Sequence, residues 1–325
     1  LETSTFLAMP QLLLGEGCEV RYHQPDRDYR RAKGHSQSEL KEVLRSPAHW
    51  LARYGPNAEP TFPSAAMIIG TALHAKVLEP EAFDGMFFDR SEKPKELTVP
   101  ELKAALEEEQ IEIPKGAKKA DLESLLYPDG KPVDKRTSLS KEDFAIVNGM
   151  TEALRTHDVT GRWFDPGRNN YRKANEISFY VDEANSPYGM PIKGRVDRLE
   201  KTKDGWLILD LKTTDDASPD AFMKKAFNLG YHLQAAFYTD LVARTFRDAN
   251  VKFVFCAIER RRPHGVALYE ASPEFLNFGM EKVQEAASSL RYALETQHFG
   301  GYSQQIQSLG LPAWAKSKQN EPDLF

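Results

Sequence analysis

Short apolar runs concentrate in the second half of the chain, where they predict a β-sheet. The runs at 176–182, 191–199 and 206–214 predict three consecutive strands. Two further runs, at 251–260 and 265–270, predict a fourth and a fifth strand. Because the first three follow one another across short connections, we expect them to pair antiparallel.

Apolar positions spaced three or four residues apart predict the helices. A stripe with Ser36 or Ser38 as N-cap predicts one helix over 36–50. A segment that is apolar nearly all round predicts a buried helix that begins near Ser64 and ends at Pro80. Further helices are predicted at 139–157, at 221–246 with a break at Gly230, and at 272–297. Helices that alternate with strands in this order predict an α/β or α+β sheet with helices on its faces.

Two segments depart from this pattern. Lys93–Arg136 is rich in Lys, Glu and Pro, and its boundaries Pro94 and Pro132 predict a self-contained insert between core segments 1–92 and 137–325. Within it, Thr98 and Glu101 have capping-box spacing, and leucines on either side of a turn around 113–119 predict two short helices. From Gly300 the pattern is irregular, so that this segment either covers part of the surface or is mobile.

Composition limits the classes of function. The 325 residues are 41% hydrophobic and 28% charged, which suits a globular protein with a sizeable core. The net charge of −5 means that any DNA site must be a local basic surface. Cys18 and Cys256 are too few for an iron–sulfur cluster and suggest no disulfide framework, which favours a reducing cytoplasm. No apolar run approaches the length of a membrane span, and the start lacks the basic region of a signal peptide.

The buried strand at 206–214 carries an acid and a base two residues apart, Asp210 and Lys212. Asp204-Gly205 is a hairpin signal, and a turn centred there would place Asp197 opposite Lys212. Two carboxylates and an ammonium would then converge, and a divalent cation would relieve the repulsion between the acids. Lys212 could position a water molecule or stabilise charge on a phosphorane. A structural Asp–Lys–Asp network would produce the same pattern.

Four other residues are candidates for the same site. Gln234 and Tyr238 lie one helical turn apart, with polar tips suited to a phosphate or a base, although for this pair alone ordinary helix packing is the better explanation. His74 lies in an apolar helix, as either a core residue or a metal ligand. Glu176 opens a predicted strand, as either a surface acid or a member of the site.

Five stretches in order resemble the PD-(D/E)xK nuclease superfamily and, more narrowly, the RecE-type exonucleases (exodeoxyribonuclease VIII and phage relatives). They are SQSELKEVLRSPAHW, GTALHAKVLEP, GRVDRL, LDLKTT and YHLQAAFY, within Ser36 to Glu295. The resemblance implies a restriction-endonuclease-like α/β fold, a mixed β-sheet flanked by helices. One departure is that Asp197 follows Val196, where the family name has Pro-Asp.

The resemblance also assigns roles to the candidate residues. Asp197 and Asp210 would bind Mg²⁺, which Mn²⁺ could replace, with the Leu211 carbonyl as a further ligand. Lys212 would be the catalytic lysine, and His74 would bind the metal or lie beside it. The remaining matches are Gln234 and Tyr238, which would position DNA, and Glu176, which matches a family acid.

By the same resemblance, the expected activity is double-strand DNA exonuclease, digesting 5′ to 3′ and leaving 3′ overhangs. Expected partners are DNA ends, a single-strand annealing protein of the RecT/Beta type and further copies of the chain in a ring, in a bacterial or phage-encoded cytoplasmic setting. The insert resembles a SAP/HeH helix–extension–helix module, with Lys115, Lys118 and Lys119 placed to bind DNA; a spacer or protein-docking unit is the alternative. Alternative functions are a structure-specific or single-strand nuclease, or a non-catalytic DNA-binding scaffold.

Overall fold

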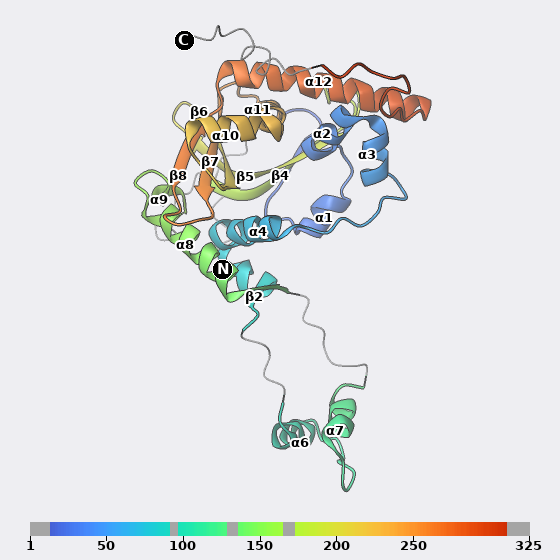
Figure 1. Ribbon diagram of the computed structural model, residues 1–325, viewed down its shortest axis with the longest axis vertical. Coiled ribbons are helices and arrows are strands. Elements are labelled where there is room, and N and C mark those ends of the chain that lie inside the picture. The colour runs from blue at the N-terminus through green and yellow to red at the C-terminus, as the bar shows by residue number, and fades with distance from the viewer. Residues whose placement is uncertain (1–13, 92–96, 129–135, 165–172, 311–325) are drawn as a thin grey trace, which may run out of the picture.

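The computed structural model describes residues 14–91, 97–128, 136–164 and 173–310. In this part of the chain a six-stranded mixed sheet has the order β1-β4-β5-β6-β7-β8 (Figure 1). Neighbouring strands are antiparallel except β6 and β7, which are parallel. The strands are β1 (Cys18–Arg21), β4 (Lys173–Val181), β5 (Ile192–Thr202), β6 (Gly205–Thr214), β7 (Val251–Glu259) and β8 (Val266–Glu270). The sheet and its helices confirm the predicted α/β fold.

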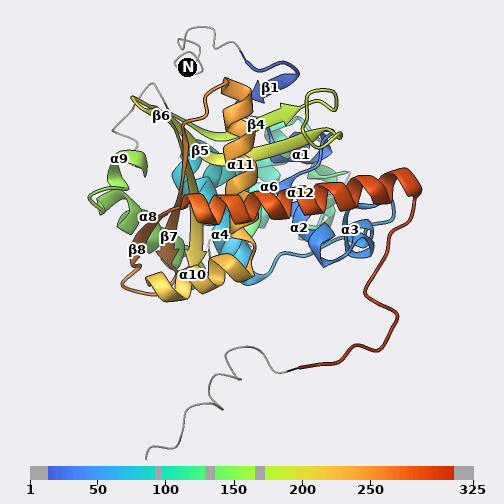
Figure 2. The same cartoon turned by 90° about the horizontal axis from the view of Figure 1, so that it is seen from above.

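Helices cover both faces of the sheet (Figures 1 and 2). One face packs against α2 (Gln37–Arg45), α11 (Tyr231–Phe246) and α12 (Pro273–Thr296), and the other against α4 (Ala65–Leu78) and α8 (Lys141–Thr156). Side chains on β6 alternate between the two cores, since Ile208 joins the first and Leu209 and Leu211 the second. Strand β6 is therefore buried from both sides, which explains its apolar run.

The predicted helix at 36–50 is confirmed at its start, where Ser36 caps α2, but its extent is wrong, because the segment forms two helices, α2 and α3 (Pro47–Tyr54). Pro47 has no N–H to continue α2, and the side chain of Ser46 accepts the N–H of His49 as the cap of α3. The buried helix is confirmed as α4, which is capped by Ser64 and ends before Pro80. The other short elements of the core are α1 (Asp26–Arg31), α5 (Pro80–Met86), α9 (Gly161–Phe164), β2 (Phe87–Asp89) and β3 (Thr137–Leu139).

The crossover between β6 and β7 consists of α10 (Pro219–Asn228) and α11, with the predicted break at Gly230 between them. Gly230 has φ 66°, a left-handed conformation that glycine adopts without steric cost. This reversal lets α11 run back across the sheet, so that its buried face meets β5 and β6. The helices predicted at 139–157 and 272–297 are confirmed as α8 and α12.

The β5–β6 hairpin has a different register from the predicted one. Thr202 pairs with Gly205, so the turn is Lys203-Asp204 rather than Asp204-Gly205. Gly205 instead lies against the loop before β7, where a Cβ atom would be 2.0 Å from the Asn250 carbonyl oxygen. Its φ of 143° also favours glycine, so both the backbone beside the turn and the tertiary contact require this residue. Consequently Asp197 does not lie opposite Lys212.

The insert contains two helices, α6 (Val99–Glu108) and α7 (Lys119–Leu126), which pack on each other. Leu102, Leu106 and Leu122 are buried in a small hydrophobic cluster of their own. The predicted capping box is confirmed, because Glu101 accepts the backbone N–H of Thr98. Figure 1 shows the pair apart from the sheet and its helices. The proposed boundaries fall partly on 92–96 and 129–135, outside the described residues, and the division into domains stays a prediction.

Two sequence features have simple structural counterparts. Cys256 is completely buried in β7, as its apolar surroundings predicted, and Cys18 is partly buried at the start of β1. Across the described ranges, no helix combines the length and apolarity needed to cross a membrane.

Candidate active site

The candidate site begins where the pairing of β5 and β6 ends, after Arg198 opposite Leu209. Beyond this point the backbone of Leu211 on the β5 side has no strand partner. Side chains take its place: the N–H of Leu211 donates to Asp197 Oδ2 at 2.7 Å, and its carbonyl accepts from His74 Nε2 at 2.9 Å. Where β5 and β6 separate, an acid of β5 and a histidine of α4 therefore bind the backbone of β6 at Leu211.

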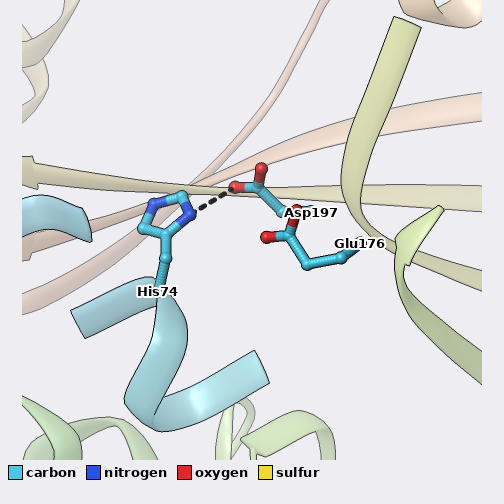
Figure 3. A group of neighbouring side chains, drawn as sticks. All are labelled: His74, Glu176 and Asp197. Carbon is cyan, nitrogen blue, oxygen red and sulfur yellow. Dashed lines mark ion pairs between the residues drawn. The ribbon is translucent and has the colours of Figure 1, made fainter. Parts of the chain in front are cut away.

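Three potential ligands meet beside this point. The ligand atoms of His74, Glu176 and Asp197 lie within 4.8 Å of one another (Figure 3). His74 Nδ1 is 3.6 Å from Asp197 Oδ2. The prediction that Glu176 opens its strand is wrong, because β4 begins at Lys173 and Glu176 lies inside it. Glu176 has φ 48°, an unfavourable conformation for a residue with a Cβ atom, and such strain is found most often at functional sites.

The electrostatics of this cluster disfavour two charged acids. Burial, together with the negative charges of Asp197 and Glu79, raises the pKa of Glu176 to about 8. Arg195 opposes the shift only partly, since its Nη1 is 3.9 Å from Glu176 Oε2. Near neutral pH Glu176 therefore retains a proton unless another positive charge enters the cluster.

A divalent cation fits this donor set. The Leu211 carbonyl can only accept a hydrogen bond, so Nε2 of His74 carries the proton of that contact. Nδ1 then faces Asp197, and a histidine held by a carbonyl through its other nitrogen is the usual arrangement of a metal ligand. Two carboxylates complete a set of oxygen donors suited to Mg²⁺ or Mn²⁺. Whether the Leu211 carbonyl also binds metal stays a prediction, since it already accepts from His74.

Asp210 and Lys212 approach the same region from the other face of the sheet. Lys212 Nζ is 2.5 Å from Asp210 Oδ2, and Asp210 Oδ1 accepts from Gln234 Nε2 of α11 at 2.7 Å. Burial, reinforced by Asp197, raises the pKa of Asp210 to about 6 although Lys212 lowers it. Burial lowers the pKa of Lys212, but the carboxylates of Asp210 and Asp197 outweigh it, and the net shift is upward. Lys212 is accordingly held as a cation beside Asp210.

The two predicted residues of α11 are both buried. Gln234 fixes one oxygen of Asp210, so its amide orients the acid. Tyr238 is 6% exposed, and burial raises the pKa of its hydroxyl well above the usual value. Its ring lies against Gly194 of β5, where an added Cβ would be 3.0 Å from Tyr238 Cε1. Gln234 therefore contacts Asp210, and Tyr238 packs against β5. The expected contact of both side chains with DNA stays a prediction.

Two basic residues near the site were not among the candidates. Arg195 lies two residues before Asp197. Because alternate residues of a strand point to the same face, the sequence could have indicated that Arg195 lies near the site. It holds Asp26 as well as Glu176, and so links α1 to the cluster. Lys41 of α2 has its pKa lowered to about 8 by burial and by the positive charge of Lys212. Nothing in its local sequence distinguishes Lys41 from an ordinary helix-surface lysine.

The candidate lysines of the insert lie outside this site. Lys115 and Lys118 are exposed, and Lys119 begins α7. The first-turn acid Asp121 accepts the N–H of Lys118 at 2.8 Å. A carboxylate of the protein therefore already lies at the start of the helix, beside two of the lysines that were expected to bind DNA. DNA binding by these lysines stays a prediction.

The mixed sheet, with acids, a histidine and a lysine gathered at the end of a central hairpin, defines a protein of the PD-(D/E)xK nuclease superfamily. Residues 36–312 match the family described as "PDDEXK-like domain of unknown function (DUF3799)", and the chain belongs to this family. A sequence search of the curated proteins finds no match.

Comparison with solved structures supports the fold. The chain is similar to the crystal structure of a protein described as a "Putative exonuclease" from Eubacterium rectale, with a TM-score of 0.55 and 10% identity over 91% of this chain and 99% of that one. Two weaker matches are SSO0001 (TM-score 0.23, 16% identity, 62% of this chain and 93% of that one) and VC1899 from Vibrio cholerae (TM-score 0.20, 10% identity, 86% and 58%). Only the first of the three is close enough to indicate a shared fold.

Proposed function

We propose that this protein is a Mg²⁺-dependent exodeoxyribonuclease that acts on double-strand DNA ends. The observation that supports the proposal is the junction at the end of the β5–β6 pairing. There the His74–Glu176–Asp197 cluster lies close to the Asp210–Lys212 pair, since Asp197 acts electrostatically on both members of that pair. A hydrolase acting on phosphodiesters needs both parts, a cation-binding set of acids and a fixed positive charge.

In the proposed enzyme, His74, Glu176 and Asp197 hold the metal, and Asp210 lies beside them. Bound there, Mg²⁺ or Mn²⁺ would polarise a phosphodiester and lower the pKa of a bound water molecule. The cluster gains from this cation because Glu176 can then lose its proton without leaving two uncompensated carboxylates together.

The other residues act through position and charge. The ammonium of Lys212 places a positive charge, and three N–H donors, where negative charge develops on the phosphoryl oxygens. Asp210 fixes that ammonium, and Gln234 fixes Asp210, so the lysine is held in place before the substrate arrives. The aromatic ring of Tyr231, 5.0 Å from Lys212 Nζ, supports the cation on its other side.

The finer parts of the proposal follow from the resemblance to RecE-type exonucleases. They are digestion of the 5′ strand to leave a 3′ overhang, a single-strand annealing protein as partner, a ring of several copies, and a bacterial or phage-encoded cytoplasmic setting. The insert then serves as a SAP/HeH-like unit that binds DNA. The name of the similar Eubacterium rectale protein agrees with the exonuclease assignment.

Cleavage assays on linear, nicked and circular duplexes, with Mg²⁺ or with EDTA, test the proposal. We expect Mg²⁺-dependent loss of the linear duplex only. Asp210→Ala and Lys212→Ala should each reduce the rate by about 10²–10³, as for other catalytic electrostatic groups. Lys252→Ala, which removes an exposed lysine of β7, is the matched control and should cleave normally.

The other outcomes point to the alternative functions. Cleavage of circular duplexes, or of single strands alone, would replace the proposal with a structure-specific or single-strand nuclease. DNA binding with no cleavage in either metal would favour a non-catalytic scaffold. Near-normal turnover in Lys212→Ala would show that its role is misassigned.

A further inference from the structure

An open aromatic groove lies away from the acids, between α10, the first half of α12 and strands β7 and β8. Its volume is about 930 Å³. Its lining includes the aromatic side chains of Phe222, Phe227, Phe255, Tyr269, Phe275 and Phe278. On α10, Met223 and Phe227 are 62% and 57% exposed, which leaves apolar surface facing solvent. Such a contiguous apolar surface marks a site at which something docks.

The edge of the groove is acidic. Glu270, Glu274 and Glu281 all belong to its lining. Glu270 pairs with Lys252, whereas Glu274 and Glu281 have no ion-pair partner within the described ranges. An occupant with an apolar stretch followed by positive charges would match both features.

The chain itself carries such a stretch after α12. Phe299 stacks on Trp50 of α3, and the ring of Tyr302 lies 5.2 Å from that of His49. Beyond these contacts every residue to Gly310 is exposed, including Ile306 and Leu309. In Figure 1, residues 297–310 double back beside α12 from its C-terminal end, and Figure 2 shows that they also extend away from the helix.

The sequence and the reach of the segment suit the groove. Residues 306–318 read IQSLGLPAWAKSK, with the apolar residues first and Lys316 and Lys318 after Trp314. The 12 residues from Tyr302 to Trp314 can extend roughly 40 Å. The 24 residues of α12 span roughly 36 Å at the usual helical rise. The segment is therefore long enough to return from α3 along most of α12.

We propose that residues 306–318 dock in the aromatic groove of their own molecule. Trp314 enters among the aromatic side chains, and Lys316 and Lys318 lie beside Glu274 and Glu281. The contact removes two sets of exposed apolar groups from water at once, the groove and the segment. A tryptophan among aromatic rings adds the favourable geometry of ring pairs. The docking is independent of the proposed nuclease activity.

Acrylamide quenching of tryptophan fluorescence in the full chain tests this contact. The other three tryptophans, Trp50, Trp163 and Trp206, are at most 7% exposed, so that quenching reports mainly on Trp314. We expect quenching of the wild-type chain to match that of Trp314→Phe, because the docked indole is shielded. A wild-type chain with one freely quenched tryptophan would overturn the proposal.

Substitutions in the groove give the opposite expectation. Met223→Gln combined with Phe227→Gln removes two exposed apolar contacts and should weaken docking about a hundredfold. Trp314 should then become freely quenched, while Met223→Leu, the matched control, keeps it shielded. Unchanged shielding in the double variant would place Trp314 elsewhere and refute the proposal.

Two further measurements test whether the two lysines pair with the acidic edge and whether the bound segment belongs to the same molecule or to a second copy. Lys316→Glu with Lys318→Glu should increase quenching at low salt, and no change would refute pairing with the acidic edge. Sedimentation velocity and quenching over a dilution series identify whose segment is bound. Shielding that persists in the monomer supports the proposal, and shielding lost together with a dimer on dilution would assign the groove to a second copy.

Discussion

Removing the charge of Glu176 should make the metal-free protein less sensitive to pH. The fold favours the protonated carboxyl, because burial and Asp197 raise its pKa from 4.5 to about 8. Its contribution to stability is complete below the unfolded-state value and is lost as the pH rises through about 8. A shift from 4.5 to about 8 corresponds to about 4–5 kcal/mol in the free energy of unfolding. Glu176→Gln cannot ionise and should avoid this loss.

Urea unfolding in EDTA at pH 5, 7 and 9 measures the effect. We expect the wild-type free energy of unfolding to fall over this range by several kcal/mol more than that of Glu176→Gln, so that the variant is the more stable protein at pH 9. Glu183→Gln, which changes an exposed acid in the turn after β4, is the matched control and should follow the wild type.

Adding Mg²⁺ should narrow the difference in stability between the wild type and Glu176→Gln. A cation that binds only the folded protein stabilises it by about 2.7 kcal/mol at a hundred times its dissociation constant. For the wild type, the increase in the free energy of unfolding should be larger at pH 8 than at pH 5, because protons compete with the cation for Glu176 at pH 5. The increase should be smaller in Glu176→Gln than in the wild type. Equal pH dependence of the wild type and Glu176→Gln in EDTA would refute the account of this cluster.

Three other predictions concern the supports of the site and the insert. Gln234→Ala and Tyr238→Ala should weaken or misplace DNA more than they reduce metal affinity in calorimetric titrations; a collapse of metal affinity alone would contradict their role. Gly194→Ala should lower the free energy of unfolding by about 1–3 kcal/mol in urea, because the new methyl group overlaps Leu241 and Tyr238; an unchanged midpoint would show that α11 can move away. Replacing Lys93–Arg136 with a short Gly/Ser linker should spare cleavage of short oligonucleotides but weaken binding to long DNA and flatten its salt dependence. An unchanged salt slope would favour the spacer or protein-docking interpretation.

The sequence predicted most of the long strands and helices around the site, and it selected residues that the structure brings close together. Strands with buried apolar runs and helices with apolar stripes follow from local periodicity, which does not depend on distant parts of the chain. Residues such as Asp210 and Lys212 could be selected because charged groups inside a buried strand are costly without a role. The break at Gly230 was predictable for the same local reason, since only glycine adopts its conformation freely.

The tertiary structure decided how these residues meet. Gly205 was predicted at the centre of a turn, but it pairs with Thr202 at the start of β6. It also lies against Asn250, a contact 45 positions away in the chain that local patterns cannot show. Because the β5–β6 pairing ends before Leu211, the backbone of Leu211 forms hydrogen bonds with Asp197 and His74 instead. No local sequence pattern determines where such a pairing ends. Periodicity places residues on faces, but only the packed sheet sets the register and the distances between side chains on different elements. The chemistry of the site depends on those distances, because charge interactions and metal binding extend over only a few ångströms.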